Sequence, residues 1–168
     1  DPEKKLAKLS KGMKMKFSIA AALSHHAELI IMDEPTSGLD PVFRRELLDI
    51  LHGLMEDGER SIIFSTHITS DLDRIADVIT LMDNGRIALS VPFDEIIENY
   101  RVIKGPKALA EKIDQSWLCG IRINKFGFEA LCTDGAKAAR EYGNAVVLEK
   151  PSIEDIMFYY SGKVGVGA

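Results

Sequence analysis

The sequence predicts an α/β fold in which a mostly parallel sheet with crossover helices precedes a small α+β domain. Two apolar runs, LIIM at 29–32 and SIIF at 61–64, are too short for helices, and each leads into polar residues. Such runs are typical of strands that are buried on both faces of a parallel sheet. A segment of helical periodicity separates them, and this alternation favours crossover connections.

The composition of the 168 residues is that of a globular protein able to bury a core, with 46% hydrophobic and 28% charged residues. The net charge of −5 does not favour a nucleic-acid partner, which would need clustered basic residues. No apolar run reaches the roughly 18 residues of a membrane-spanning helix. Cys119 and Cys132 lack metal or redox spacing, so we expect buried free thiols in a reducing, cytosolic compartment.

The first helix is expected to begin at or just after Gly12 and to include the run FSIAAAL, which ends at Leu23. Basic residues cluster before and within it, from Lys4 to Lys16. Two interpretations of this cluster remain open, a solvated helix face and a face directed at phosphate.

A strand is predicted at 27–33, and Pro35 ends it because the residue before a proline avoids helical dihedral angles. Asp40 is the predicted N-cap of the next helix, with Pro41 at the first helical position. This helix reaches Gly58, and its apolar positions fall on one face: Leu47, Leu48, Leu51, Leu54 and Met55.

A second buried strand is predicted at 60–67, where RSIIF leads into STH. A short helix follows at 70–77, with Ser70 as its expected cap. Two β-rich runs then flank Asn84-Gly85, a strong signal for a two-residue hairpin turn.

The pattern changes after residue 98, so we predict two domains, residues 1–98 and 99–168. Gly105-Pro106 is a break, and strand-like runs then alternate with short helical ones. A final helix is predicted from Pro151 to Tyr160. The apolar face of this helix comprises Ile153, Ile156, Met157 and Tyr160. The favoured interpretation is that this face covers the small sheet of its own domain. The alternative is that it contacts a partner near Ile156 and Tyr160, as part of an interaction or regulatory module.

Asp33 and Glu34 stand side by side where the first apolar strand ends. Ligands bind at the carboxyl ends of parallel strands, where the turning chain lets both carboxylates reach one crevice. An apolar strand that ends in Asp is the Walker B pattern, whose carboxylate helps to hold Mg²⁺ on nucleotide phosphates. An acidic turn that starts a helix is the alternative, but the flanking PTSGLD and STH segments favour nucleotide hydrolysis.

Four motifs in register resemble the ATP-binding subunits of ATP-binding cassette (ABC) transporters: LSKGMKMK, LIIMDEP, SGLD and STH. They are similar to the signature motif, Walker B with the catalytic glutamate, the D-loop and the switch histidine, over roughly the first 98 residues. The resemblance implies the C-terminal part of an ABC-type P-loop NTPase. It further implies that Asp33 helps to coordinate Mg²⁺, that Glu34 is the general base and that His67 contacts the γ-phosphate.

The same resemblance implies that Asp40 lies at a dimer seam. It also implies that Ser10, Lys11 and Gly12 bind the ATP held by the opposite subunit, since a helix N-terminus attracts anions. The usual signature is LSGGQ, whereas Lys11 and Met13 stand here in place of Gly and Gln. Lys11 either adds charge near phosphate or points to solvent. The GM form followed by basic residues resembles bacterial exporters and peptide-resistance transporters.

The sequence contains no GxxxxGK[ST] phosphate-binding loop. In the family this loop and the Q-loop precede the signature, so we expect the C-terminal part of a longer subunit and no ATPase activity from these residues alone. The implied cofactors are ATP and Mg²⁺. The implied partners are a transmembrane transporter subunit and a second ATPase subunit, identical or different, at the cytoplasmic face of the cell membrane. The alternative function is a soluble ABC-type ATPase without a transport role.

Overall fold

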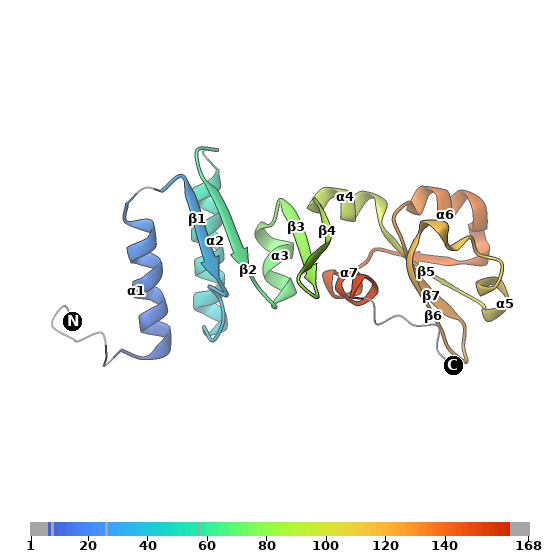
Figure 1. Cartoon of the computed structure of the whole chain (residues 1–168), viewed down its shortest axis with the longest axis horizontal. Helices are drawn as coiled ribbons and strands as arrows, with labels where there is room; N and C mark the ends of the chain where they lie inside the picture. Colours follow the sequence, from blue (N-terminus) through green and yellow to red (C-terminus); the bar gives the residue numbers. More distant parts are fainter. Residues whose placement is uncertain (1–6, 8, 26, 57, 162–168) are drawn as a thin grey trace. The chain divides into compact units, whose positions relative to one another are not determined.

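The computed structural model describes residues 7, 9–25, 27–56 and 58–161, except for the side chain of Lys11. The chain divides into two compact units, Asp1–Ile75 and Ala76–Ala168 (Figure 1). The predicted boundary between residues 98 and 99 marks the end of the segment that resembles an ATPase, which is a different criterion from compactness. That boundary stays a prediction.

The first unit is built on one pair of parallel strands joined by a crossover helix, as the sequence predicted. Leu29 pairs with Ser61 and Asp33 pairs with Ser65, so the carboxyl ends of both strands lie at the same edge (Figure 1). In chain order, the elements of this unit are α1 (Lys11–Leu23), β1 (Leu29–Asp33), α2 (Pro41–Met55), β2 (Ser61–Ser65) and α3 (Thr69–Ile75).

Side-chain caps fix where two of these helices begin. Ser10 caps α1 by accepting a hydrogen bond from the Met13 amide, and the helix begins at Lys11, one residue before the predicted start. Asp40 caps α2 as predicted, with Pro41 in the first turn. The cap predicted at Ser70 is wrong, because α3 begins at Thr69 and includes Ser70.

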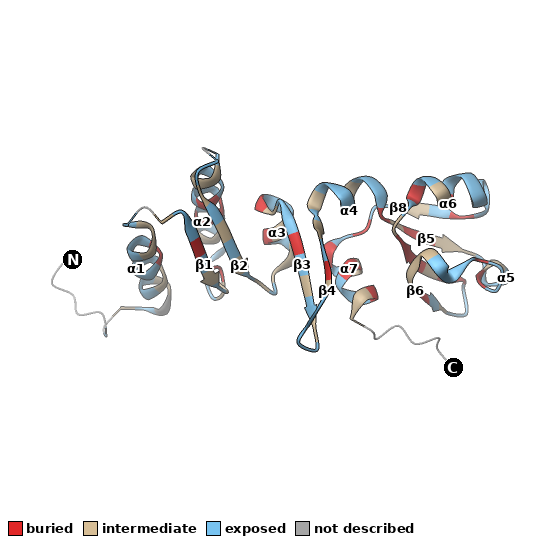
Figure 2. Cartoon of the chain, turned by 45° about the horizontal axis from the view of Figure 1, so that its top comes forward, coloured by how far each residue is buried: buried red, intermediate tan, exposed pale blue. Residues whose placement is uncertain are grey.

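The core of the first unit lies on one face of β1 and β2. Buried residues of the three helices pack there with partly buried side chains of both strands: Ile19, Leu47, Leu48, Leu51 and Ile75, with Met32, Ile62 and Phe64. On the opposite face Leu29, Ile31 and Ile63 are 51%, 71% and 58% exposed. Figure 2 shows only exposed and intermediate positions along β2. Burial on both faces was therefore a wrong prediction for these strands within this chain, because strand side chains alternate and the helices cover one face.

The second unit begins with an antiparallel hairpin, β3 (Val78–Asp83) and β4 (Arg86–Pro92), which forms a sheet of its own. The predicted two-residue hairpin turn is confirmed, and Asn84 and Gly85 both have positive φ angles, 47° and 74°, as a type I′ turn requires. The parallel character of the described sheets is thus confined to β1 and β2.

A four-stranded antiparallel sheet in the order β6-β7-β5-β8 follows, which confirms the small α+β region. Its adjacent residues Val102 and Ile103 are both buried, so both faces of the sheet are covered. The remaining α-helices and β-strands are α4 (Phe93–Asn99), β5 (Arg101–Gly105), α5 (Lys107–Ala110), β6 (Leu118–Ile123), β7 (Phe128–Cys132), α6 (Gly135–Tyr142), β8 (Val147–Glu149) and α7 (Ile153–Tyr160). Two 3₁₀ helices, η2 (Gln115–Trp117) and η3 (Gly143–Ala145), lie among them.

The final helix, α7, packs against β6 and β7, as the favoured interpretation predicted. Ile153, Ile156 and Tyr159 are buried there, and Ser152 caps the helix in a reciprocal capping box with Asp155. The partner contact expected near Ile156 is wrong, since that side chain is 1% exposed.

Both cysteines are free, as predicted. Cys132 is fully buried, and Cys119 is half-buried with its thiol 3.2 Å from the Tyr160 hydroxyl. Burial raises the pKa of both thiols, so they remain protonated at neutral pH.

Candidate functional site

Asp33 occupies the carboxyl end of β1, directly opposite Ser65 of β2. The Ser65 hydroxyl donates a hydrogen bond of 2.5 Å to Asp33 Oδ1. By the alternation of the strand, Asp33 lies on the same exposed face as Ile31. Its carboxylate is therefore oriented by the neighbouring strand while it remains open to solvent.

Glu34 leaves the strand in an unusual backbone conformation, with a φ angle of 49°. This left-handed region is unfavourable for a residue with a Cβ atom, so the surrounding contacts must hold it. The Glu34 amide lies 3.0 Å from Ser65 Oγ and 3.2 Å from the Ser65 carbonyl oxygen, and the Ser37 amide donates to the Glu34 carbonyl. The chain thereby turns sharply at the end of β1, as the adjacent carboxylates predicted.

The Glu34 side chain meets His67, which follows β2 by two residues. Glu34 Oε2 lies 2.7 Å from His67 Nδ1, and the two side chains are 34% and 68% exposed. The separation is within hydrogen-bond range, but Glu34 Oε2 makes no aligned hydrogen bond within the described residues. Glu34 Oε2 is buried and has no hydrogen-bond donor within the described residues. The pair therefore holds an acceptor oxygen that is available for a donor.

The segment that carries His67 is itself fixed by a local turn. Thr66 Oγ1 accepts a hydrogen bond of 3.0 Å from the Ile68 amide. Because β1 and β2 run parallel, this turn lies at the same edge of the sheet as Asp33 and Glu34. The structure thus brings His67 to the end of the sheet at which Asp33 and Glu34 lie.

The predicted nucleotide-binding residues Ser10 and Gly12 lie at the N-terminus of α1, where Lys11 is the first helical residue. Ser10 is exposed, and a Cβ atom added at Gly12 would meet nothing within 4 Å. Asp40 is exposed at the N-terminus of α2. In the described part of the chain, neither Ser10 nor Asp40 bonds to Asp33, and their predicted roles at a subunit interface stay predictions.

Sequence patterns did not predict the buried polar cluster that Thr36, Arg44 and Asp71 form. Asp71 of α3 accepts hydrogen bonds of 2.6 Å from Thr36 Oγ1 and from Arg44 Nε. Arg44 also donates to the hydroxyl of Ser70. Their spacing was a possible indication of this cluster, because Asp71 follows His67 by four residues and Arg44 follows Asp40 by four. Polarity alone did not distinguish these side chains from solvated ones.

The donor set at this edge fits Mg²⁺ held jointly with nucleotide phosphates. The described residues contain no group of three or more His, Cys, Asp or Glu side chains that could hold a metal ion. Mg²⁺ in phosphate-transfer sites takes one or two carboxylates and completes its shell with phosphate oxygens and water. The solvent-exposed carboxylate of Asp33 meets that requirement, because Ser65 already orients one of its oxygens.

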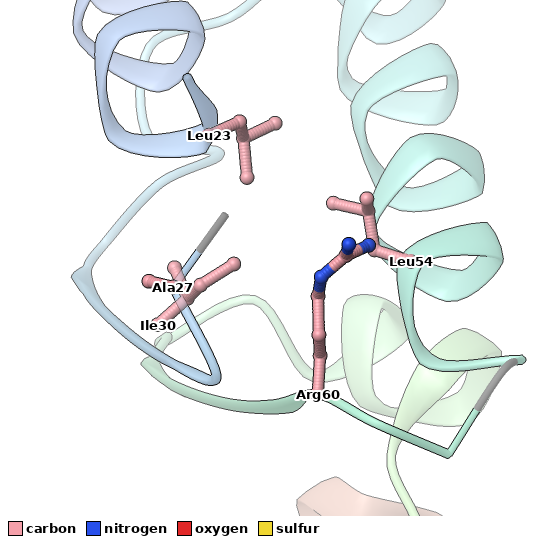
Figure 3. Close-up of a pocket in the computed structure, with 5 residues that line it drawn as sticks. All are labelled: Leu23, Ala27, Ile30, Leu54 and Arg60. Carbon is pink, nitrogen blue, oxygen red and sulfur yellow. The ribbon is translucent and has the colours of Figure 1, made fainter. Parts of the chain in front are cut away.

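A small apolar pocket lies elsewhere in the first unit (Figure 3). It lies at the amino end of β1, remote from the carboxyl end that carries Asp33, and no carboxylate lines it. Its lining residues are Leu23, Ala27, Ile30, Leu54 and Arg60. This pocket is not part of the polar edge of the sheet.

Across the described ranges, no helix combines the length and apolarity needed to cross a membrane.

Comparison with known proteins agrees with the four motifs. Residues 5–72 match the family model described as "AAA domain, putative AbiEii toxin, Type IV TA system". The bacitracin transport ATP-binding protein of Bacillus licheniformis is 36% identical over 101 residues, which are 60% of this chain and 33% of that protein. The protein of the same name from Enterococcus faecalis is 39% identical over 92 residues, or 55% of this chain and 30% of the relative.

The lantibiotic transport ATP-binding protein SrtF of Streptococcus pyogenes is 37% identical over 103 residues, which are 61% of this chain and 44% of that protein. The chain thus spans between about a third and less than half of the relatives that it matches. Over these 92 to 103 residues, the chain is related to the ATP-binding proteins of ABC transporters, as its motifs predicted.

Proposed function

We propose that the protein carrying this chain is an ATP-binding and ATP-hydrolysing subunit of an ABC transporter. The main support is the arrangement at the end of β1, where Glu34 is held in a left-handed turn with Oε2 2.7 Å from His67 Nδ1. The relatives are named for different cargoes, bacitracin and a lantibiotic, so the proposal concerns the ATPase that they share.

Glu34 accepts a proton from the attacking water or orients that water toward the γ-phosphate. Its buried Oε2 has no donor of its own in the described part, which leaves an acceptor available for this purpose. His67 lies beside the same oxygen and is exposed enough to contact a phosphate group. Asp33, which Ser65 orients, would help to hold Mg²⁺ at the end of β1. When bound, this ion neutralises charge on the phosphates.

The N-terminus of α1 is the second proposed nucleotide contact. Ser10, Lys11 and Gly12 contact the ATP of an opposite subunit, and Asp40 lies at the seam between the two. The open space around Gly12 and the positive end of a 13-residue helix support anion binding there. This arrangement requires a dimer of ATPase subunits, identical or different.

The proposed partner is a transmembrane transporter subunit, and the proposed location is the cytoplasmic face of the cell membrane. Residues 99–168 form an accessory region that does not contact ATP. Its sheet and helices bury an apolar core and contain none of the four motifs. Removing this region from the intact protein is expected to leave basal ATPase activity within a few-fold of the parent.

The decisive experiment replaces Glu34 by Gln in the intact protein. We expect phosphate release to fall by about 10²–10⁴-fold, the usual contribution of a general base. ATP binding should persist, because Gln preserves the shape of the side chain, and gel filtration with ATP should show a trapped dimer. Glu46→Gln is a matched control, since Glu46 is exposed on α2.

Near-parental turnover by Glu34→Gln would remove Glu34 from the catalytic role. The soluble alternative predicts that the purified protein recovers no membrane subunit and that its ATPase responds to none. Co-purification with a membrane protein whose presence changes the ATPase rate would support the transporter assignment.

A further inference from the structure

Asp71 is fully buried, and its carboxylate is nevertheless well satisfied. Its exposed fraction is 0%, and Thr36, which is 1% exposed, donates to Oδ2 at 2.6 Å. Arg44 Nε donates to Oδ1, also at 2.6 Å. A buried carboxylate without partners would be strongly unfavourable, so these bonds constrain the three side chains to one arrangement.

The partners of Asp71 come from the same segments that carry the proposed catalytic residues. Thr36 lies two residues after Glu34, in the turn that leaves β1. Arg44 lies in the first turn of α2, where its amide bonds to the Asp40 carbonyl. Asp71 lies one helical turn beyond His67, and its own amide bonds to the Ile68 carbonyl. One carboxylate therefore joins three segments that the sequence leaves separate.

A second ion pair joins α2 and α3 in a different environment. Arg74 donates to Asp49 Oδ1 at 2.8 Å, and these side chains are 41% and 60% exposed. Exposed pairs of this kind contribute little to structure because solvent competes for both charges. The pairs Arg44–Asp71 and Arg74–Asp49 connect the same two helices, and only the first includes a fully buried carboxylate. Comparing variants of the two pairs therefore separates the effect of burial from the effect of joining α2 to α3.

We propose that Asp71 is a positioning residue, which through Thr36 and Arg44 fixes the turn of Glu34 relative to His67 and thereby accelerates ATP hydrolysis. This inference rests on the proposed function of the site. Asp71 does not touch ATP, since its side chain is enclosed. Its effect is on the rate of the chemical step, because that step requires Glu34 in a conformation with a φ angle of 49° that it would not otherwise favour.

The loss of one anchor has a defined consequence. If Thr36 no longer donates to Asp71, the turn that follows Glu34 loses its connection to α3. Glu34 can then relax toward an ordinary backbone conformation, which moves its carboxylate away from His67. Displacements of about 1 Å at a reacting group can lower turnover by about 10²-fold. Groups that bind the nucleotide elsewhere would be unaffected.

The test compares Asp71→Asn and Thr36→Val in the intact protein. Both variants nearly preserve shape; the first removes the buried charge, and the second removes the hydroxyl donor. We expect kcat to fall on the order of tenfold or more, while the ATP dissociation constant stays within about threefold. Thr36→Ser retains the donor and should recover most of the turnover. Asp49→Asn, the matched control in the exposed pair, should leave kcat unchanged.

Hydrogen exchange provides a readout that does not depend on activity. The amides of Ser37 and Leu39 donate to the carbonyl oxygens of Glu34 and Thr36 within the turn. Thr36→Val and Asp71→Asn should accelerate exchange at both amides, whereas Asp49→Asn should not. Unchanged exchange at these amides would overturn the positioning role of Asp71. This result does not depend on whether Glu34 is the catalytic base.

Other outcomes are equally decisive. Parental turnover in Asp71→Asn, or an equal loss of turnover in Asp49→Asn, would overturn the positioning role. A parallel loss of turnover, ATP binding and thermal stability would show that the cluster is only structural. If Asp71→Asn fails to fold, the pair Thr36→Val and Thr36→Ser decides, since loss and recovery must follow the hydroxyl. Full activity in Glu34→Gln would instead overturn the proposed function.

Discussion

The strands β1 and β7 have similar apolar character and very different surroundings. In β1 the side chains of Leu29 and Ile31 are 51% and 71% exposed, while Ile30 between them is 6% exposed. In β7 the residues Ala130, Leu131 and Cys132 are all fully buried. The first strand is thus covered on one face and the second on both.

The difference comes from the neighbours of each strand rather than from its residues. β7 lies between β5 and β6, with α7 packed on one side and the main core of the second unit on the other. β1 pairs with β2, and the helices of the first unit cover one face of that pair. An apolar run therefore indicates what a strand can bury, and the number of packing layers decides what it does bury.

The largest expected effect is at the first residue of the covered strand. Phe128→Ala should destabilise the second unit by roughly 3–5 kcal/mol, because the side chain is 1% exposed and its loss leaves a cavity. Urea unfolding measures this change in the second unit through the fluorescence of Trp117, the single tryptophan, and far-ultraviolet circular dichroism follows both units. Ile31→Ala is the control on β1 and should change stability far less. Equal losses would show that both strands are covered alike in solution.

A smaller loss is expected where two backbones approach closely beside β7. A Cβ atom added at Gly127 would lie 2.3 Å from the carbonyl oxygen of Gly105, so Gly127→Ala must displace the turn. We expect a loss of about 1–3 kcal/mol in the same urea experiment. Gly53→Ala on α2 meets nothing within 4 Å and should stabilise its helix slightly. A neutral Gly127→Ala would contradict this close approach.

Alkaline pH should weaken the second unit selectively. Burial is the largest cause that raises the pKa of Tyr159, from 10.0 to about 12. The unfolded chain then loses its proton first, so this contribution is intact below pH 10 and declines as pH rises toward about 12. Residues 1–75 contain no tyrosine or cysteine and lack this effect. Tyr159→Phe should reduce the slope of stability against pH between 10 and 12, measured with Trp117 fluorescence; an unchanged slope would contradict it.

The smallest effect on stability is expected on the uncovered face of β1 and β2. Replacing Ile31 and Ile63 by Thr keeps β-branching, so the free energy of unfolding should change by less than about 0.5 kcal/mol for each. Binding of a hydrophobic dye and light scattering should both decrease, because exposed apolar area is removed. Ile30→Thr on the covered face is the control and should destabilise the unit. Unchanged dye binding would mean that this face is already covered in solution.

The sequence located several features correctly because each depends on local chemistry. Asn84-Gly85 specifies its turn by positive φ angles, and Asp40-Pro41 specifies a helix start. Ser70 was misassigned as a cap, since a serine near a helix start has the same local preference whether it caps or bonds elsewhere. Its hydroxyl instead accepts from Arg44, 26 residues away in sequence, and no local pattern contains that information.

The sequence by itself determined the motifs, the strand–helix order and the adjacency of Asp33 and Glu34, because these follow from residue identity and short-range periodicity. Only the tertiary structure decided that Glu34 turns toward His67 and that Asp71 is a buried partner of Thr36 and Arg44. It also decided which apolar faces are covered. Burial and pairing are properties of residues distant in sequence, so their energies arise only when the chain has packed.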